Sequence, residues 1–432
     1  MWTTHPKCAT IINSAWSKSH VGSHAYKLGK KIATIRDTFR KWNKEVFGRV
    51  EREIEKKKEE LQCIQENITS VEDIRRETEH REQLEQLLHR EEISWSEKAR
   101  KEWDLKGDRN TKYYQAVVRN RRRHNKIIQI KNEEDVWIFD QAQIEQCFCN
   151  YFHKLYADTP QYNIEEIQLQ LNCLQIPSLT DQQRNALDQP MEDAEILQAI
   201  HQLGPLKAPG PDSIPAAFYQ KFWPIVQQDV LHMVKAFFHS GFLLKSLNHT
   251  FIKLLPIVPT PERVTQFRPI SLCNVSYKII SKILVNRLKP LMDGLITPFQ
   301  NAFVQGRQIT DNIILAHEIF EYLKKKGKGK WEFAALKVDM NKAYDRISWP
   351  FLTAVLKTMG FSDRWITWVS QCVQTISYSI LLNGSPTGNF KPNRGLRQGD
   401  PLSPYLFLLC ANILSCALLK QETLKNLKGI KI

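Results

Sequence analysis

The chain lacks the cysteine pattern of a disulfide-stapled protein. It has nine cysteines, an odd number, with no CxxC pair, and the closest spacing is Cys147-x-Cys149. Small secreted domains that depend on disulfides carry even numbers of cysteines at framework-like spacings. The count therefore excludes a disulfide framework, and a reducing compartment fits it better.

Long apolar runs are also missing. The longest one, Pro404–Leu419, has 16 residues and is interrupted by Asn412 and Ser415, whereas a membrane-spanning helix needs roughly 20 apolar residues. We expect a buried core helix there and no membrane partner. Polar residues occur throughout residues 1–20, which have no apolar segment of signal-peptide length, so they predict no secretion. No repeat of fixed period is visible, which argues against a solenoid.

Acidic residues are too few to balance the basic ones. Lys and Arg number 61 against 46 Asp and Glu, which gives a net charge of +15 and a pI near 9.3. A surplus of this size points to a polyanionic partner such as nucleic acid. The 42% of hydrophobic residues is enough for ordinary cores, and 432 residues suggest several domains at about 150 residues each.

Residues 31–100 are dense in Lys, Arg and Glu and contain no proline. Apolar residues recur there at helical spacing, which predicts two long paired helices with a possible break at Thr69-Ser70. Both signs of charge are mixed along this stretch, so a solvated face is favoured over RNA binding.

Positive charge is concentrated farther on, between residues 106 and 130, beside Tyr113 and Tyr114. Basic side chains next to stackable rings suit a phosphate backbone and unpaired bases. We interpret this run as a candidate nucleic-acid site, with a solvated loop as the alternative. The residues concerned are Arg119, Arg121, Arg122, Arg123 and Lys126.

The C-terminal part alternates short apolar runs with helical patterns and predicts an α+β fold. Residues 334–339 indicate a buried strand that ends on Asp339. Ser348 can cap a helix that Gly360 ends, and a second helix over 363–374 follows. A strand over 377–382, a turn at Asn383-Gly384 and a return strand precede a loop and the apolar helix.

Asp339 is a candidate for metal-dependent chemistry. Nucleotidyl transfer by two metal ions needs carboxylates at the ends of adjoining strands, where the ions can clamp the attacking and leaving oxygens. A strand-terminal Asp is more often a helix cap or turn residue. Its context strengthens the functional interpretation, because Tyr344 follows five residues later and a Gly-rich basic loop spans 394–399.

Five segments, in order, resemble non-LTR (LINE-type) retrotransposon reverse transcriptases. KVDMNKAYDRISW resembles motif A, RGLRQGDPLSPYLFLL motif B, and FRPISLCNVSYKIISKILVNRLKP the fingers motif. QNAFVQGRQITDNIILAHEIF and LKAPGPDSIPAAFYQKFWP resemble further segments of that family. Residues 91–127 are similar to the connector that follows the endonuclease in plant-type members, so the resemblance covers most of the chain.

The resemblance implies specific roles. Asp339 would be the catalytic metal ligand, helped by the backbone carbonyl of Met340. Tyr344 would exclude a ribose 2′-hydroxyl, since a rigid ring clashes with the added oxygen. Arg268 would hold the triphosphate. Gln398 and Gly399 would complete the nucleotide site. Asp345 matches a family position too, but we expect it to cap or brace the turn.

Three departures from the family pattern stand out. Ile257 occupies the position of a Lys that contacts phosphate, unless Lys253 reaches across, and Ser213 occupies the position of a Gly. The third concerns motif C, the [FY]ADD hairpin: the 432 residues contain no Asp-Asp pair, and Glu422 is the only acid after Asp400. We therefore expect a fragment lacking the endonuclease and everything from motif C onward.

From these features we expect four regions: a helical and basic connector (1–157), a linker (158–190), an N-terminal polymerase motif with fingers (191–330) and a partial palm (331–432). The resemblance implies an RNA-directed DNA polymerase with an RNA template, a DNA primer, dNTP substrates and Mg2+ or Mn2+, working in the nucleus. One carboxylate cannot hold two metal ions, so these residues should be inactive alone. The alternative is a catalytically dead nucleic-acid-binding remnant.

Overall fold

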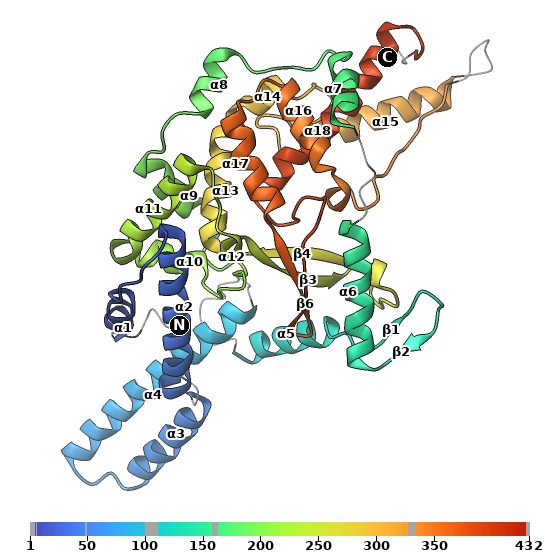
Figure 1. Ribbon diagram of the computed structural model, residues 1–432. Coiled ribbons are helices and arrows are strands. Elements are labelled where there is room, and N and C mark those ends of the chain that lie inside the picture. Colours follow the sequence, from blue (N-terminus) through green and yellow to red (C-terminus); the bar gives the residue numbers. More distant parts are fainter. Residues whose placement is uncertain are drawn as a thin grey trace. The chain divides into compact units, whose positions relative to one another are not determined.

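The computed structural model describes residues 5, 7–47, 50–99, 111–157, 163–326 and 333–428. The chain divides into two compact units. The first comprises residues 1–127, 204–208 and 212–229, and the second comprises 128–203, 209–211 and 230–432. The first unit is helical and the second contains a small mixed sheet (Figure 1). The predicted α+β class with a helical N-terminal part is confirmed.

Helices make up the described part of the first unit. They are α1 (Lys7–Trp16), α2 (His24–Trp42), a π-helical turn (Asn43–Phe47), α3 (Val50–Glu66), α4 (Val71–Ala99), α5 (Thr111–His124) and α10 (Ala216–Lys221). The start of α11 (Trp223–Ser240) also belongs to it. Asp229 joins α1 and α2 to α11. Its Oδ2 accepts hydrogen bonds from Trp16 Nε1 and Lys31 Nζ, each at 2.8 Å.

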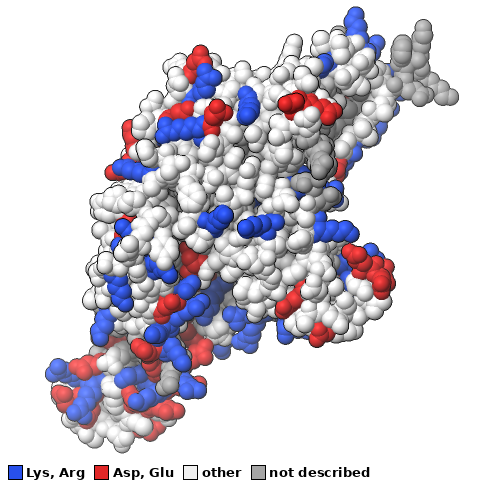
Figure 2. Space-filling view, viewed as in Figure 1, with Lys and Arg blue, Asp and Glu red and all other residues white. Residues whose placement is uncertain are grey.

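Helices α3 and α4 pair as an antiparallel hairpin (Figure 1). The predicted break is confirmed: the Ser70 hydroxyl donates to Asp73 Oδ2 at 2.8 Å and accepts from the Asp73 amide at 3.2 Å. This reciprocal cap satisfies amides that a helix start leaves unpaired. Blue and red side chains are interspersed over the hairpin in Figure 2, as expected for a solvated face.

The core of the second unit is a four-stranded sheet in the order β4-β3-β5-β6. Strand β3 (His249–Pro256) pairs antiparallel with β4 (Phe267–Cys273) and parallel with β5 (Ser377–Leu382). The predicted hairpin is confirmed, since β5 turns at Asn383-Gly384 into β6 (Ser385–Phe390). A separate two-stranded ribbon joins β1 (Ile130–Lys131) to β2 (Trp137–Ile138).

Helices make up most of the rest of the second unit. They are α6 (Gln141–Ala157), α7 (Ile164–Asn172), α8 (Asp181–Leu187), α9 (Asp193–Gln202), α12 (Lys245–Asn248), α13 (Val275–Leu288), α14 (Met292–Leu295), α15 (Ile309–Lys325), α16 (Trp349–Thr358), α17 (Asp363–Gln374) and α18 (Ser403–Thr423). Single 3-10 turns span Val264–Gln266, Lys289–Leu291 and Tyr344–Arg346. The caps predicted for α16 are confirmed, because Ser348 accepts from the Phe351 amide and Gly360 has φ +78°.

Helix α18 contains the apolar run. By length and composition it could cross a membrane, but 44% of the relevant window is buried inside the unit. Asn412 on its inner face accepts from the Thr297 amide and hydroxyl at 3.0 and 2.9 Å. Leu414 and Leu418 are exposed on another face. The helix therefore packs into the unit along one side, as predicted for a core helix.

The strand predicted over 334–339 is not formed. These residues have no regular secondary structure, and Leu336 and Val338 are 87% and 70% exposed. A strand is stable only when a neighbouring strand pairs with its backbone and a facing layer covers its apolar side. Within the described residues, the four paired strands of the sheet include neither Leu336 nor Val338. The prediction of a buried strand was wrong for this reason.

Candidate active site

The turn after Asp339 positions the second half of motif A. Lys342 adopts φ +55°, and the Arg346 amide donates to its carbonyl at 3.2 Å. The 3-10 turn Tyr344–Arg346 then leads into α16. Asp339 itself is exposed and has no hydrogen bond or ion pair to the described part of the chain.

The motif B loop lies directly against this turn. The Leu396 amide donates to the Tyr344 carbonyl at 2.7 Å, and the Gly395 amide donates to the Ile347 carbonyl at 2.8 Å. Trp349 Nε1 donates a hydrogen bond to the Gly395 carbonyl at 2.9 Å. Gly395 has φ +95°, and a Cβ there would be 2.8 Å from the Asp345 carbonyl oxygen. Only glycine permits this approach.

The same loop also contacts the edge of β4. The Ser271 amide donates to the Gln398 carbonyl at 2.7 Å. Gly399 follows with φ +110°, and a Cβ on it would be 3.0 Å from the Ser271 carbonyl oxygen. Arg268 is exposed on the same strand, three residues before Ser271. The motif B loop thus links the turn that carries Tyr344 to the strand that carries Arg268.

The Tyr344 ring is held by α18. It stacks on Phe407 with ring centroids 4.9 Å apart and planes 14° from parallel. Half-burial raises the pKa of the Tyr344 phenol above its ordinary value. A stacked, partly buried ring has little rotational freedom, which suits a steric gate.

Two other carboxylates near the loop, Asp345 and Asp400, are buried and hydrogen-bonded to other side chains. Asp345 is 1% exposed and its Oδ1 accepts from the Tyr156 hydroxyl at 2.7 Å, while its Oδ2 has no hydrogen-bond partner among the described residues. Burial raises the pKa of Asp345, and the Tyr156 hydrogen bond opposes that rise. The brace expected of Asp345 is therefore present, joining α6 to the turn.

Asp400 belongs to a buried ion pair that sequence reasoning missed. Arg397 is 2% exposed and donates to Asp400 Oδ2 through Nε at 3.0 Å and Nη2 at 2.7 Å. Its Nη1 donates to Asn248 Oδ1 at 2.6 Å, and its guanidinium lies 3.8 Å from the Tyr277 ring centroid. Opposite charges three residues apart in one short loop were the available signal. The pair anchors the loop that presents Gln398 and Gly399.

Within the described residues, the carboxylates of motifs A and B do not form a metal site. Among the described residues, no group of three or more His, Cys, Asp or Glu side chains could hold a metal ion. Asp339 and Met340 are both exposed on the irregular segment, and Asp345 and Asp400 are buried against other partners. The residues present therefore do not fit a two-metal centre.

The basic run lies mainly on α5 of the first unit. Arg121 donates to the Ala99 carbonyl at 2.6 Å, where it caps α4, and Arg119 donates to Gln115 at 3.1 Å. The side chains of Arg122, Arg123 and Lys126 are exposed and make no hydrogen bond or ion pair within the described ranges.

One aromatic of the basic run is not available for base stacking. Tyr114 is buried in a small cluster with Ala99 and Val118. Tyr113 is exposed, and its ring centroid lies 5.9 Å from that of Tyr114. The helical period explains the difference, because neighbouring residues on a helix point to different faces. The expectation that both tyrosines could stack was therefore wrong for Tyr114.

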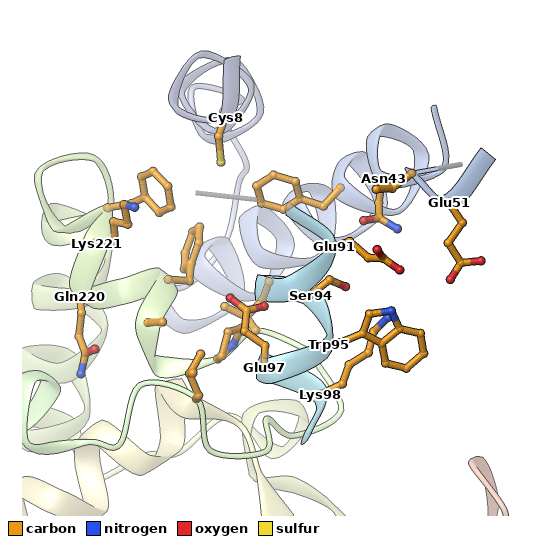
Figure 3. A pocket seen from close by; sticks show the side chains of 18 of the residues that line it. Cys8, Asn43, Glu51, Glu91, Ser94, Trp95, Glu97, Lys98, Gln220 and Lys221 are labelled. Atoms are coloured by element: carbon orange, nitrogen blue, oxygen red, sulfur yellow. The ribbon is translucent and has the colours of Figure 1, made fainter. Parts of the chain in front are cut away.

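The first unit also contains a cavity of about 1110 Å³. Figure 3 shows Trp95 and Glu91 of α4 beside it, with Lys221 and Gln220 from α10 and Cys8 from α1. Burial raises the pKa of Glu91, and the nearby Glu51 adds to the rise. None of its lining residues comes from motif A or motif B. The chemistry-bearing residues, rather than this cavity, define the candidate site.

Comparisons with known proteins agree with the motifs. The family described as reverse transcriptase (RNA-dependent DNA polymerase) matches residues 258–429. A transposon TX1 uncharacterized 149 kDa protein of Xenopus laevis is 25% identical over 385 residues, which are 88% of this chain and 29% of that protein.

Two Drosophila melanogaster proteins are also similar. The probable RNA-directed DNA polymerase from transposon BS is 24% identical over 66% of this chain and 30% of its own length. The Pol polyprotein from the type-2 retrotransposable element R2DM is 26% identical over 47% of this chain and 18% of its own length. The chain spans less than a third of each of these three relatives. With motif B docked on motif A, the matches identify residues 258–429 as a reverse transcriptase domain of the non-LTR retrotransposon kind.

Proposed function

We propose that this chain supplies the nucleotide- and template-holding part of an RNA-directed DNA polymerase of a LINE-type, plant-like retrotransposon. The observation that carries the proposal is the docking of the motif B loop on the motif A turn and on β4. This docking gathers Tyr344, Gln398 and Gly399 beside the strand of Arg268. The reaction would join a deoxynucleotide to a DNA primer on an RNA template, and Asp339 would be one ligand of two Mg2+ or Mn2+ ions.

Nucleotide binding tests this proposal without requiring turnover. Titration of the 432-residue chain with dCTP and with CTP isolates the 2′-hydroxyl, since the two nucleotides are otherwise identical. We expect dCTP to bind more tightly than CTP. Tyr344→Ala should reduce this difference in affinity, because the smaller side chain leaves room for the 2′-oxygen of CTP. Tyr344→Phe is the matched control, because it keeps the ring that stacks on Phe407. Absence of dCTP binding would contradict the proposal.

We further propose that these 432 residues do not polymerise DNA by themselves. Two-metal catalysis needs several carboxylates around both ions, and here Asp339 has no described carboxylate partner. Primer extension on oligo-dT annealed to poly-rA, with dTTP and Mg2+ or Mn2+, should give no product. Extension that disappears in Asp339→Ala would refute this part while leaving the polymerase assignment intact.

A second candidate function, a nucleic-acid-binding remnant without catalysis, is favoured by the exposed cations Arg122 and Arg123 of α5 and Lys126 just after it, whose side chains have no ion pair within the described residues. Each phosphate contact contributes a slope of about 0.9 in log K against log salt on duplex DNA and about 0.7 on single strands. Reversal of Arg122, Arg123 and Lys126 to Glu should weaken binding and flatten that slope. Reversal of Arg75, which pairs with Glu79 on α4, is the control. An unchanged salt slope in the triple variant would remove α5 as the site.

A further inference from the structure

Helix α6 lies outside the residues that carry the family match. It spans Gln141–Ala157, whereas the family described as reverse transcriptase matches residues 258–429. The helix nevertheless belongs to the second compact unit, together with motif A and motif B. Figure 1 shows it beside the four-stranded sheet, where it contacts β5 and β6. It is therefore packed against the polymerase motifs although it is distant from them in sequence.

The middle of α6 contacts both edge strands of that sheet. The buried ring of Phe148 meets Phe267 of β4 edge-on, with ring centroids 5.4 Å apart. Cys149, the next residue, lies against Gly388 of β6. A Cβ on Gly388 would be 2.8 Å from Cys149 Sγ, and the glycine has φ +62°. The helix is thus held closely against the sheet before its last turn.

The last turn of α6 holds the start of motif B. The Asn393 amide donates to the Tyr156 carbonyl at 2.9 Å. Arg394 donates to the Leu155 carbonyl through Nε at 2.9 Å and through Nη2 at 2.8 Å. The last carbonyls of a helix have no partner within the helix, and a cation there also interacts favourably with the helix dipole. The end of α6 therefore fixes the place where the motif B loop begins.

The same turn of α6 reaches motif A. The Tyr156 hydroxyl donates to Asp345 Oδ1 at 2.7 Å, and both side chains are buried. Asp345 directly follows Tyr344 in a single 3-10 turn. Because a turn this short moves as one piece, the hydrogen bond to Asp345 also constrains the backbone that carries the Tyr344 ring.

The Tyr156 side chain has little freedom to move. Its ring centroid lies 5.3 Å from that of Tyr378 on β5 and 6.0 Å from that of Phe390 on β6. Phe152, one turn earlier on α6, stacks on it with centroids 6.2 Å apart. A buried ring enclosed by three others loses little further entropy when its hydroxyl bonds to a partner. The donor is therefore held in place before it meets Asp345.

We propose that Tyr156 is a positioning residue for the steric gate: through Asp345 it sets where the Tyr344 ring lies, and so how strongly the site rejects a ribonucleotide. This inference rests on the proposed function, in which Tyr344 excludes the 2′-hydroxyl. The gate is then held twice, directly by the stacking of Phe407 on its ring and through its backbone by Tyr156. Selection of the sugar depends in this way on a helix outside the matched residues.

The test is equilibrium titration of the 432-residue chain with dCTP and with CTP. Tyr156→Phe keeps the ring and its packing but loses the hydroxyl. The ratio of the CTP to the dCTP dissociation constant should fall by about three- to tenfold, as for loss of one hydrogen bond. Tyr219→Phe is the matched control, because it removes a buried hydroxyl of the first unit that has no hydrogen-bond partner among the described residues. The control should keep the wild-type ratio.

This ratio separates positioning from a purely structural role. A variant that is partly unfolded binds both nucleotides more weakly by the same factor, so its ratio stays at the wild-type value. A double-mutant cycle examines the partner. Asp345→Ala should lower the ratio as well, and Tyr156→Phe in that background should lower it no further, because the two side chains act through one bond.

The outcomes distinguish this inference from the proposed function. A preference for dCTP that is lost in Tyr344→Ala but kept in Tyr156→Phe would overturn the role of Tyr156 and leave the proposed function standing. Fully additive effects of Tyr156→Phe and Asp345→Ala would also overturn that role. A wild-type chain that does not bind dCTP would overturn both.

Discussion

The two halves of motif A differ in how they contact the rest of the chain. Residues 342–349 are held by hydrogen bonds from Tyr156, Gly395 and Leu396 and by the stacking of Tyr344 on Phe407. Residues 334–340 are exposed and make no hydrogen bond to the described part of the chain. The same motif is thus ordered on one side and unsupported on the other.

This difference shows which part of the motif is organised by groups within these residues. The second half has its partners in α6, α18 and the motif B loop, all of which are present. The first half, which carries Asp339, would need a neighbouring strand to become part of a sheet. The proposed nucleotide-binding residues and the proposed metal ligand therefore lie in differently supported parts of the motif, and substitutions should affect the two halves very differently.

The largest effect should come from breaking the ion pair beneath the ordered half. Arg397→Ala leaves Asp400 charged and buried without its main partner, which costs about 3–5 kcal/mol of unfolding free energy. Asp339→Ala, in the unsupported half, should change it by less than about 0.5 kcal/mol. Urea unfolding of both variants provides the comparison. Equal stability of the two would mean that Arg397 does not anchor the loop.

A control separates lost charge pairing from lost packing. Arg397→Met with Asp400→Leu removes both charges while keeping side-chain volume, and buried pairs replaced in this way are often tolerated. The double variant should therefore be more stable than Arg397→Ala alone. If it is less stable, packing and hydrogen bonds to Asn248 and Tyr277 matter more than the pair.

The next effect concerns the close approach between motif B and motif A. Gly395→Ala should destabilise the chain by about 2 kcal/mol, because φ is +95° and the new Cβ would be 2.8 Å from the Asp345 carbonyl oxygen. Gly294→Ala is the matched control: nothing lies within 4 Å and the residue is in helix α14, so alanine should stabilise by up to about 1 kcal/mol. Thermal and urea unfolding would measure both. An unchanged free energy of unfolding in Gly395→Ala would show that the loop can move away from the turn.

A smaller effect is expected in the exposed half. Leu336→Lys with Val338→Lys should leave the unfolding free energy within about 0.5 kcal/mol of wild type. It should raise solubility, because exposed apolar residues in an extended, unpaired segment promote association. Light scattering across a concentration series would detect the change. A clear loss of stability would instead indicate that these side chains are buried in solution.

Local patterns predicted much of this fold. The Ser348 cap, the end of α16 at Gly360, the β5–β6 hairpin and the α3–α4 break each depend on residues close in sequence. The wrong strand at 334–339 depends on a partner strand, which no local pattern supplies. Arg397 was missed because several of its partners, Asn248, Thr250 and Cys372, are distant in sequence and meet only in the folded chain.

The smallest expected effect is a pH dependence from Asp345 in the ordered half. Burial raises the pKa of Asp345 in the folded state, so the folded chain retains a proton that the unfolded chain releases above about pH 4. The stabilisation from this group is therefore complete below that pH and is lost as pH rises through the folded-state pKa. Asp345→Asn should gain stability relative to wild type as pH increases over this window.

A second variant tests the same carboxyl. Tyr156→Phe should lose more stability than wild type as pH rises, since the Tyr156 hydrogen bond opposes the rise in the pKa of Asp345. Urea unfolding at several pH values measures both slopes, and parallel curves for wild type and Asp345→Asn would show that this carboxyl is not desolvated.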